Sequence, residues 1–237
     1  MLEVPPHVTA RVIARCGVAH PFADLLASET ALVVIDLQTA FLNDAIGYAV
    51  CPAGCAIVPQ VNIIADALRE AGGGVFWVMD TFDPGAAAEW RSLHAMLTPQ
   101  ARARREAALA EGSLGHQLWP GLDVRTEDGI VRKYRFSAFL PGASDLPDLL
   151  RARGFDGVLV AGLLTNACCE SSARDAMMLN FRTVMVSDAN AAMTPEEHRA
   201  SLLGFYSLFG DVMETAVVIT NLARAPRGRR PGMPARP

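Results

Sequence analysis

The chain has 237 residues, 51% of them hydrophobic, and a formal net charge of −4 at pH 7. This length suits one domain with a sizeable core, and no apolar run reaches the roughly 18 residues that a membrane-spanning helix requires. The last 17 residues hold five arginines and no acidic residue, so the rest of the chain is more acidic than the total and is a poor match for nucleic acid.

The N-terminus and the cysteines indicate a compartment that keeps thiols reduced. Residues 1–22 include early prolines and no unbroken apolar stretch, which is unlike a secretory signal, so we expect a cytoplasmic protein. Five cysteines are an odd number and two of them are adjacent, which favours free thiols over a disulfide framework. The stretch CPAGC has no second pair and no nearby histidine to complete a zinc set, so we interpret Cys51 and Cys55 as loop thiols.

Apolar runs and amphipathic segments alternate through most of the chain. The predicted strands cover 31–38, 74–80, 129–134, 157–164, 182–189 and 214–220. The predicted helices cover 57–72, 86–110, 144–155, 165–181 and 194–210. Apolar strands separated by helices predict an α/β fold in which a mainly parallel, six-stranded sheet is covered by helices on both faces. We divide the chain into an N-terminal extension (1–28), one domain (29–220) and a flexible Arg/Pro-rich tail (221–237).

Chemically useful side chains follow several of the predicted strands. Asp36 and Gln38 end the first strand, Asp80 ends the second, Lys133 lies in the third, and TNACC follows the fourth. Because ligands bind at the carboxyl ends of parallel strands, we expect a carboxylate, an ammonium and a thiol at one edge of the sheet. Lys133 is the only lysine among 21 basic residues, and its compact charge can be aimed at a single atom more easily than the planar fork of arginine.

This set of groups predicts nucleophilic catalysis by a cysteine. Cys168 would lie in the first turn of a helix, where the helix dipole and a nearby Lys133 would lower the pKa of the thiol. Asp36 would accept the thiol proton, pass it to the leaving amine and later activate water. The backbone N–H groups of Ala167 and Cys168 would form an oxyanion hole.

Three motifs, VVIDLQ, RKYRFSAF and GLLTNACCESSARDA, together resemble those of the isochorismatase-like cysteine hydrolases. They occur in the family's order and spacing, the match covers most of residues 30–220, and the last motif is the most specific. The resemblance implies a three-layer, Rossmann-like α-β-α fold. It also implies that Asp36, Lys133 and Cys168 form the family's catalytic triad.

The last motif also bears on the local structure around the nucleophile. Adjacent helical residues point about 100° apart, so only one of Cys168 and Cys169 can face a site. The family's spacing selects Cys168 and leaves Cys169 to core packing. Family members usually have a non-proline cis peptide in the turn before the cysteine, which would be the bond between Leu163 and Leu164 here.

The resemblance further narrows the reaction. Isochorismatases, which cleave a vinyl ether, typically lack the nucleophilic cysteine, so Cys168 favours acyl chemistry on an amide or ureide. Nicotinamidases have a D-x-H metal site, whereas here Asp80 is followed by Phe82 in place of the histidine, so we predict no metal and no other cofactor. The branch that fits contains ureidoacrylate amidohydrolases and N-carbamoylsarcosine amidases. It implies a small-molecule substrate and a homo-oligomer, either a dimer or a tetramer.

The residues around the motifs supply a candidate substrate pocket. The residues predicted to line it are Gln38, Phe41, Trp90, Tyr134, Phe136, Phe139 and Asn166. The aromatic members of this set fit a hydrophobic core equally well. Arg104 and Arg105 are interpreted as a solvated helix face, with a lid that binds a substrate carboxylate as the less favoured alternative. Asp188 and Asn190 are interpreted as turn and capping residues.

Two other classes of function stay open at this point. One is an isochorismatase-type or other hydrolase that acts on a different small substrate. The other is a non-catalytic protein that kept the fold, or a thiol redox sensor that uses Cys168, Cys169 or the 51/55 pair. The sensor alternative leaves Lys133 and Asp36 without a function.

Overall fold

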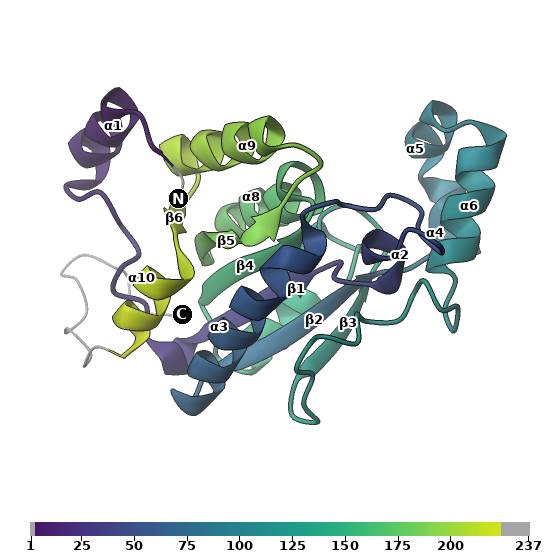
Figure 1. Ribbon diagram of the computed structural model, residues 1–237. Coiled ribbons are helices and arrows are strands. Elements are labelled where there is room, and N and C mark those ends of the chain that lie inside the picture. The colour runs from purple at the N-terminus through teal and green to yellow at the C-terminus, as the bar shows by residue number, and fades with distance from the viewer. Residues whose placement is uncertain (1–2, 224–237) are drawn as a thin grey trace.

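A computed structural model describes residues 3–223 as a parallel sheet of six strands between two layers of helices (Figure 1). The strands are β1 (Thr30–Ile35), β2 (Gly74–Asp80), β3 (Gly129–Lys133), β4 (Gly157–Leu163), β5 (Arg182–Ala191) and β6 (Asp211–Met213). They lie in the order β3-β2-β1-β4-β5-β6, and every neighbouring pair is parallel. The predicted fold class, a three-layer α/β arrangement around a parallel six-stranded sheet, is confirmed.

Helices connect these strands and cover both faces of the sheet. The helices are α1 (Pro6–Cys16), α2 (Thr39–Leu42), α3 (Val58–Glu70), α4 (Pro84–Glu89), α5 (Arg91–Met96), α6 (Pro99–Leu109), α7 (Leu146–Ala152), α8 (Glu170–Met178), α9 (Pro195–Leu208) and α10 (Thr215–Leu222), with short turns η1 (Ala27–Glu29), η2 (Gly54–Ile57) and η3 (Thr165–Cys169). Helices α3 and α10 pack on one face of the sheet, and α7, α8 and α9 pack on the other. No helix among residues 3–223 is long and apolar enough to cross a membrane.

Strand β1 shows why the central strands are so apolar. All six of its residues are buried, and its side chains alternate between the two faces. Leu32 and Val34 enter the core under α3. Val33 and Ile35 enter the core under α8. Burial on both faces favours a continuous β-branched run, so polar side chains first become possible where the strand ends, and Asp36 is the first residue beyond it.

The sixth predicted strand is wrong. Residues 214–220 lie mostly in α10, and β6 is a three-residue strand that ends at Met213. The Asp188 carboxylate holds the first turn of α10, because its Oδ1 accepts hydrogen bonds from the backbone N and the Oγ1 of Thr215, both at 2.8 Å. Asp188 therefore caps α10 as predicted, but it lies within β5 and not in a turn. Asn190 also lies within β5, and its Nδ2 donates to the carbonyls of Val160 and Val186, so its prediction as a turn residue is wrong. The helix extends into the predicted tail as far as Leu222, and the rest of that tail, from residue 224, lies outside the described residues.

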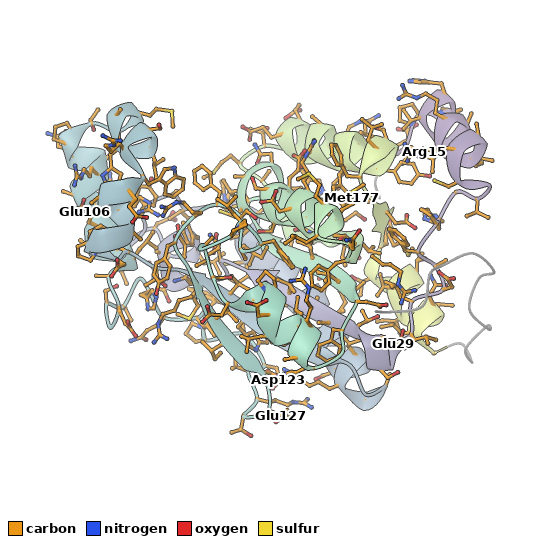
Figure 2. All side chains as sticks on the ribbon, turned by 180° about the vertical axis from the view of Figure 1, so that it is seen from behind. Arg15, Glu29, Glu106, Asp123, Glu127 and Met177 are labelled. Atoms are coloured by element: carbon orange, nitrogen blue, oxygen red, sulfur yellow. The ribbon has the colours of Figure 1, made fainter. Side chains whose placement is uncertain are left out.

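The segment predicted as one helix, 86–110, forms the three shorter helices α4, α5 and α6. Thr98 starts α6, because its Oγ1 accepts a hydrogen bond from the backbone N of Ala101 at 3.2 Å and Pro99 follows at the first helical position. These helices project beyond the sheet, and Glu106 of α6 lies at the opposite end of the molecule from Arg15 of α1 (Figures 1 and 2).

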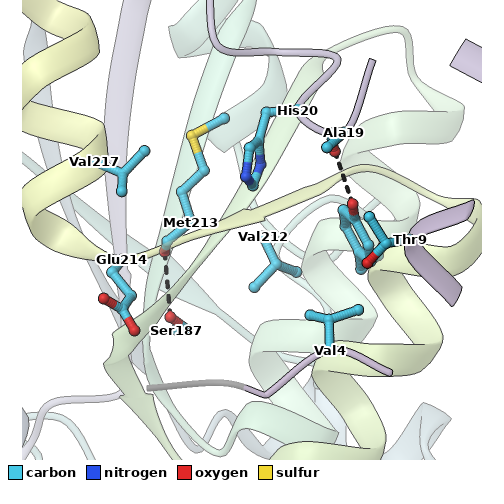
Figure 3. Close-up of a pocket in the computed structure, with 10 residues that line it drawn as sticks. Val4, Thr9, Ala19, His20, Ser187, Val212, Met213, Glu214 and Val217 are labelled. Atoms are coloured by element: carbon cyan, nitrogen blue, oxygen red, sulfur yellow. Dashed lines mark hydrogen bonds between the residues drawn. The ribbon is translucent and has the colours of Figure 1, made fainter. Parts of the chain in front are cut away.

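The part of the N-terminal extension that the structure describes, residues 3–28, packs on α9 and β6. Val8 and Val12 of α1 are buried, and the hydroxyl of Tyr206 donates a hydrogen bond to the carbonyl of Ala19 at 2.8 Å. A cavity of about 300 Å³ remains between the extension and the end of the sheet (Figure 3). The extension is therefore an integral layer over this end of the domain.

A histidine–carboxylate pair joins this extension to β6. His20 Nδ1 lies 2.9 Å from Oδ1 of the buried Asp211. This hydrogen bond raises the pKa of His20 above its usual 6.5, although partial burial opposes the shift. Because the pKa is raised in the folded protein, the protonated histidine stabilises the fold fully below about pH 6.5. That contribution is lost as the pH rises through the folded-state pKa.

We therefore expect His20→Gln to lower the melting temperature more near pH 6 than near pH 9. The measurement is thermal unfolding of the variant and the wild-type protein, followed by circular dichroism at both pH values. His7→Gln is the matched control, since His7 is an exposed histidine of α1, and it should leave the melting temperature unchanged. An equal loss at both pH values would show that protonation of His20 does not contribute.

Candidate active site

The structure brings together the three residues that the sequence analysis selected. Asp36 follows β1, Lys133 ends β3, and Cys168 lies in η3, directly after β4. Lys133 Nζ lies 2.9 Å from Asp36 Oδ2 and 3.5 Å from Cys168 Sγ. The side chains of Lys133 and Asp36 are 0% and 2% exposed, so this contact is buried within the protein. The predicted convergence at the carboxyl edge of the sheet is present.

The backbone at Asp36 aims its carboxylate at this point. Asp36 has φ = +57°, a left-handed conformation that few non-glycine residues adopt. Its N–H still donates to the carbonyl of Val78 in β2, at 2.9 Å, before the chain turns. Its Oδ1 accepts a hydrogen bond from the backbone N–H of Asp80 at 3.1 Å, which leaves Oδ2 for Lys133. The hydrogen bonds around Asp36 hold the residue in this strained conformation.

Burial and charge set the protonation states of this cluster. Burial alone would lower the pKa of Lys133, but the carboxylates of Asp36 and Asp80 outweigh it, so the pKa is raised and Lys133 is an ammonium. Burial raises the pKa of Asp36 to about 6, with Lys133 opposing. Near neutral pH the cluster therefore holds one ammonium beside one carboxylate that is ready to take up a proton.

The pKa of the Cys168 thiol is shifted in the direction opposite to our prediction. Burial raises it well above its usual value, the Asp36 carboxylate acts in the same direction, and Lys133 offsets these effects only in part. Cys168 does lie in the first helical turn, as predicted, since η3 continues directly into α8, but the charge of Lys133 is already paired with Asp36. The raised pKa favours the neutral thiol, whose sulfur contacts Lys133 Nζ.

The turn before Cys168 differs from the family pattern. All peptide bonds among residues 3–223 are trans, so the predicted cis bond between Leu163 and Leu164 is wrong. The chain is redirected instead by Gly162, whose φ of +118° suits glycine. A Cβ at this glycine would lie 2.0 Å from the carbonyl oxygen of Ile35, so the close approach of β4 to β1 also requires glycine.

One of the two predicted oxyanion donors already has a hydrogen-bond acceptor within the protein. The N–H of Ala167 donates to the carbonyl of Leu164 at 3.0 Å, so this donor is occupied in the resting turn. The N–H of Cys168 remains the predicted donor. Cys169 is fully buried in the core, and its sulfur lies 4.0 Å from the carbonyl oxygen of Ala161, in agreement with its predicted packing role.

Three of the predicted pocket residues are buried. Gln38 is fully buried, and its amide binds the backbone of Asp80 through both its oxygen and its nitrogen, at 2.8 and 3.1 Å. Phe41 and Phe139 are 8% and 0% exposed and belong to the two cores. Gln38 and Phe139 therefore support the strand ends and the sheet, whereas Phe41 is as exposed as Cys168 and its contact with substrate stays a prediction.

The other four predicted pocket residues are accessible. Tyr134 and Trp90 are partly exposed, and Phe136 and Asn166 are exposed. Trp90 and Phe136 contact each other edge to face, with ring centroids 4.9 Å apart. Their positions are compatible with the mouth of a site, and their contact with substrate stays a prediction.

An ion pair beside the site, between Arg105 and Asp80, was not predicted from the sequence. We expected Arg105 on a solvated face, but its side chain is 7% exposed and its Nη2 lies 3.1 Å from Asp80 Oδ2. The signal was available in the helix pattern, because Arg105 has the i, i+3, i+4 spacing to Ala108 and Leu109, which are both buried. An arginine on the apolar face of a helix indicates a buried partner.

The remaining thiols and potential metal ligands are dispersed. All five cysteines are free. Cys51 donates to the carbonyl of Ala192 at 3.2 Å, and Cys55, which is exposed, faces the carbonyl of Leu42 at 3.8 Å. Within residues 3–223, no three His, Cys, Asp or Glu side chains are grouped so that they could hold a metal ion.

Comparisons with known proteins identify the family of this chain. The Isochorismatase domain model matches residues 30–217. The ureidoacrylate amidohydrolase RutB of Pseudomonas syringae pv. syringae is 31% identical over 196 residues, which cover 77% of this chain and 79% of the relative. The probable inactive nicotinamidase At3g16190 of Arabidopsis thaliana is 31% identical over 176 residues, which cover 73% and 86%. The crystal structure of a cysteine hydrolase from Pseudomonas syringae pv. phaseolicola 1448A matches with a TM-score of 0.74 and 28% identity, over 84% of this chain and 94% of that one.

The matched region runs from the start of β1 into α10 and includes Asp36, Lys133 and Cys168. Fold, sequence and the order of the motifs along the chain therefore agree. The chain belongs to the isochorismatase family of hydrolases.

Proposed function

We propose that this protein is a cysteine-dependent amidohydrolase that releases ammonia from a small amide or an N-carbamoyl (ureido) compound through a covalent intermediate on Cys168. The observation that carries the proposal is the position of Lys133 Nζ, 2.9 Å from the carboxylate of Asp36 and 3.5 Å from the sulfur of Cys168. The name of the relative from Pseudomonas syringae pv. syringae, a ureidoacrylate amidohydrolase, supports the choice of substrate class.

In the first step the sulfur of Cys168 attacks the carbonyl carbon of the substrate, and the thiol proton passes to Asp36. A carboxylate with a pKa of about 6 can hold this proton transiently. The ammonium of Lys133 stabilises the sulfur while negative charge develops on it. The N–H of Cys168 is the proposed donor to the oxygen of the tetrahedral intermediate.

In the second step the proton on Asp36 moves to the nitrogen of the leaving group, the C–N bond breaks, and ammonia departs. The acyl or carbamoyl group is then bonded to the sulfur of Cys168. Asp36, again a carboxylate, takes a proton from water as the water attacks this carbonyl. The C–S bond breaks, the thiol is restored, and the acid or carbamate leaves.

The test is ammonia release from a panel of ureides and primary amides, measured as a function of pH. Since the base must be ionised, kcat/KM should rise as the pH increases through about 6, the pKa of Asp36. The folded Cys168→Ala variant is the blank. No ammonia from any panel member, from folded wild-type protein, would instead place this chain with non-catalytic members of the fold.

A further inference from the structure

Arg105 is a buried arginine whose guanidinium is only partly used. Its Nη2 donates to both carboxylate oxygens of Asp80, at 3.1 and 3.2 Å. No residue in the described part of the chain accepts a hydrogen bond from its Nε or Nη1. Among residues 3–223, the fully buried side-chain nitrogen and oxygen atoms without a hydrogen-bond partner are Arg182 Nε and Asn190 Oδ1. Because Nε and Nη1 of Arg105 are not among them, these two nitrogens are accessible from outside the protein. Three N–H groups of Arg105 therefore remain for a ligand.

Arg135, the second arginine beside Trp90, provides a contrast. Its Nη1 donates to the backbone carbonyls of Ala86 and Tyr134, at 3.2 and 2.8 Å. Both guanidinium groups lie over the Trp90 ring, at 5.9 Å from its centroid for Arg105 and 5.3 Å for Arg135. Arg135 is thus held by the protein itself, whereas Arg105 is oriented by one carboxylate and retains unused donors.

Arg105 reaches the same edge of the sheet as the proposed nucleophile. Its partner Asp80 is aligned with Lys133 across β2 and β3, and the backbone N–H of Asp80 donates to Asp36 Oδ1 at 3.1 Å. Asp80 therefore links Arg105 to both Asp36 and Lys133.

We propose that Arg105 binds a carboxylate of the substrate and so selects short substrates that carry this anion beyond the scissile amide or ureide. This inference rests on the proposed function. A guanidinium matches the two oxygens of a carboxylate, and a site with little water strengthens the interaction. Asp80 fixes the orientation of the guanidinium. Because Asp80 adjoins Lys133 in the sheet, a carboxylate bound to Arg105 would lie at the carboxyl ends of β2 and β3.

The competing explanation is that Arg105 only neutralises Asp80. Removal of one member of a buried ion pair leaves an uncompensated charge, so Arg105→Gln alone would disturb the site for every substrate. The double variant Asp80→Asn/Arg105→Gln removes both charges together and separates the two roles. Arg102→Gln is the matched control, because Arg102 lies on the same helix, exposed and paired with Glu106.

The experiment compares ureidoacetate and 3-ureidopropionate with their methyl esters, with ammonia as the product measured. We expect kcat/KM for the acids to fall by roughly 10- to 100-fold in the double variant, mainly through KM. Loss of the Asp80 charge also acts on Lys133, but equally for acids and esters, so the ratio of kcat/KM for acids to that for esters should fall roughly 10-fold or more. The control variant should change kcat/KM for all substrates by less than about threefold. An equal fall for acids and esters, or recovery of acid turnover in the double variant, would assign Arg105 to the ion pair alone.

A binding measurement separates this inference from the proposed reaction. Titration calorimetry of the same acids with Cys168→Ala, with and without the double substitution Asp80→Asn/Arg105→Gln, requires no chemistry. Weaker binding of the acids on loss of Arg105 supports the inference even if the wild-type protein releases no ammonia. Equal binding of the acids by both proteins, or no binding by either, would overturn it.

Discussion

Cys168→Ala is expected to reduce ammonia release by a factor on the order of 10⁴ or more, because loss of the nucleophile removes the covalent route entirely. The cost in stability should be small, since the side chain is only slightly larger than alanine and lies at the edge of the core, 8% exposed. Initial rates on the best ureide or amide, with folding checked by circular dichroism, measure this effect.

The neighbouring thiol provides the control. Cys169→Ala removes a sulfur that is fully buried, one residue further along the same turn. Its turnover should stay within a few fold of the wild-type value, even if its melting temperature falls. Retained turnover in Cys168→Ala together with its loss in Cys169→Ala would reverse the assignment of the nucleophile.

Lys133→Met is expected to impair both folding and catalysis. The substitution leaves the carboxylate of Asp36, which is 2% exposed, without its ammonium. Breaking a buried pair in this way costs about 3–5 kcal/mol of unfolding free energy. It also removes the charge that opposes the upward shift of the Asp36 pKa, so less of the base is ionised at neutral pH. Urea unfolding and ammonia release measure the two effects separately.

The double variant Asp36→Asn/Lys133→Met separates stability from function. Because no unpaired charge remains, the unfolding free energy should recover most of its loss, whereas ammonia release should not recover. A double variant as unstable as Lys133→Met would mean that shape rather than charge dominates at this position. Turnover in either variant near the wild-type rate would remove Lys133 from the proposed mechanism.

The fold was largely predictable because its signals are local and strong. Strands such as β1 are buried on both faces and read as uninterrupted apolar runs. The run at 214–220 failed for the same reason, since a short apolar segment does not distinguish a strand from a buried helix. The helix at this position is supported by the hydrogen bond from the backbone N of Thr215 to the Asp188 carboxylate, and these two residues are far apart in the sequence.

The residues that form the site could be predicted from the sequence, whereas the pKa of the thiol and the partner of Arg105 could not. The sheet edge brings Asp36, Lys133 and Cys168 together, as the strand order requires. The pKa of the thiol depends on burial and on the prior pairing of Lys133, neither of which a motif records. The partner of Arg105 likewise depends on how α6 packs, although its helical face contained the hint.

The most direct test of the central claim is the mass of the protein during turnover. Wild-type protein is mixed with saturating substrate, quenched in acid within one turnover, and digested with trypsin. We predict that the acyl or carbamoyl mass appears on peptide 154–174 at Cys168, and that it persists at this position in Cys169→Ala. A burst of ammonia from protein whose peptide is unmodified, or an adduct on any other residue, would contradict the account.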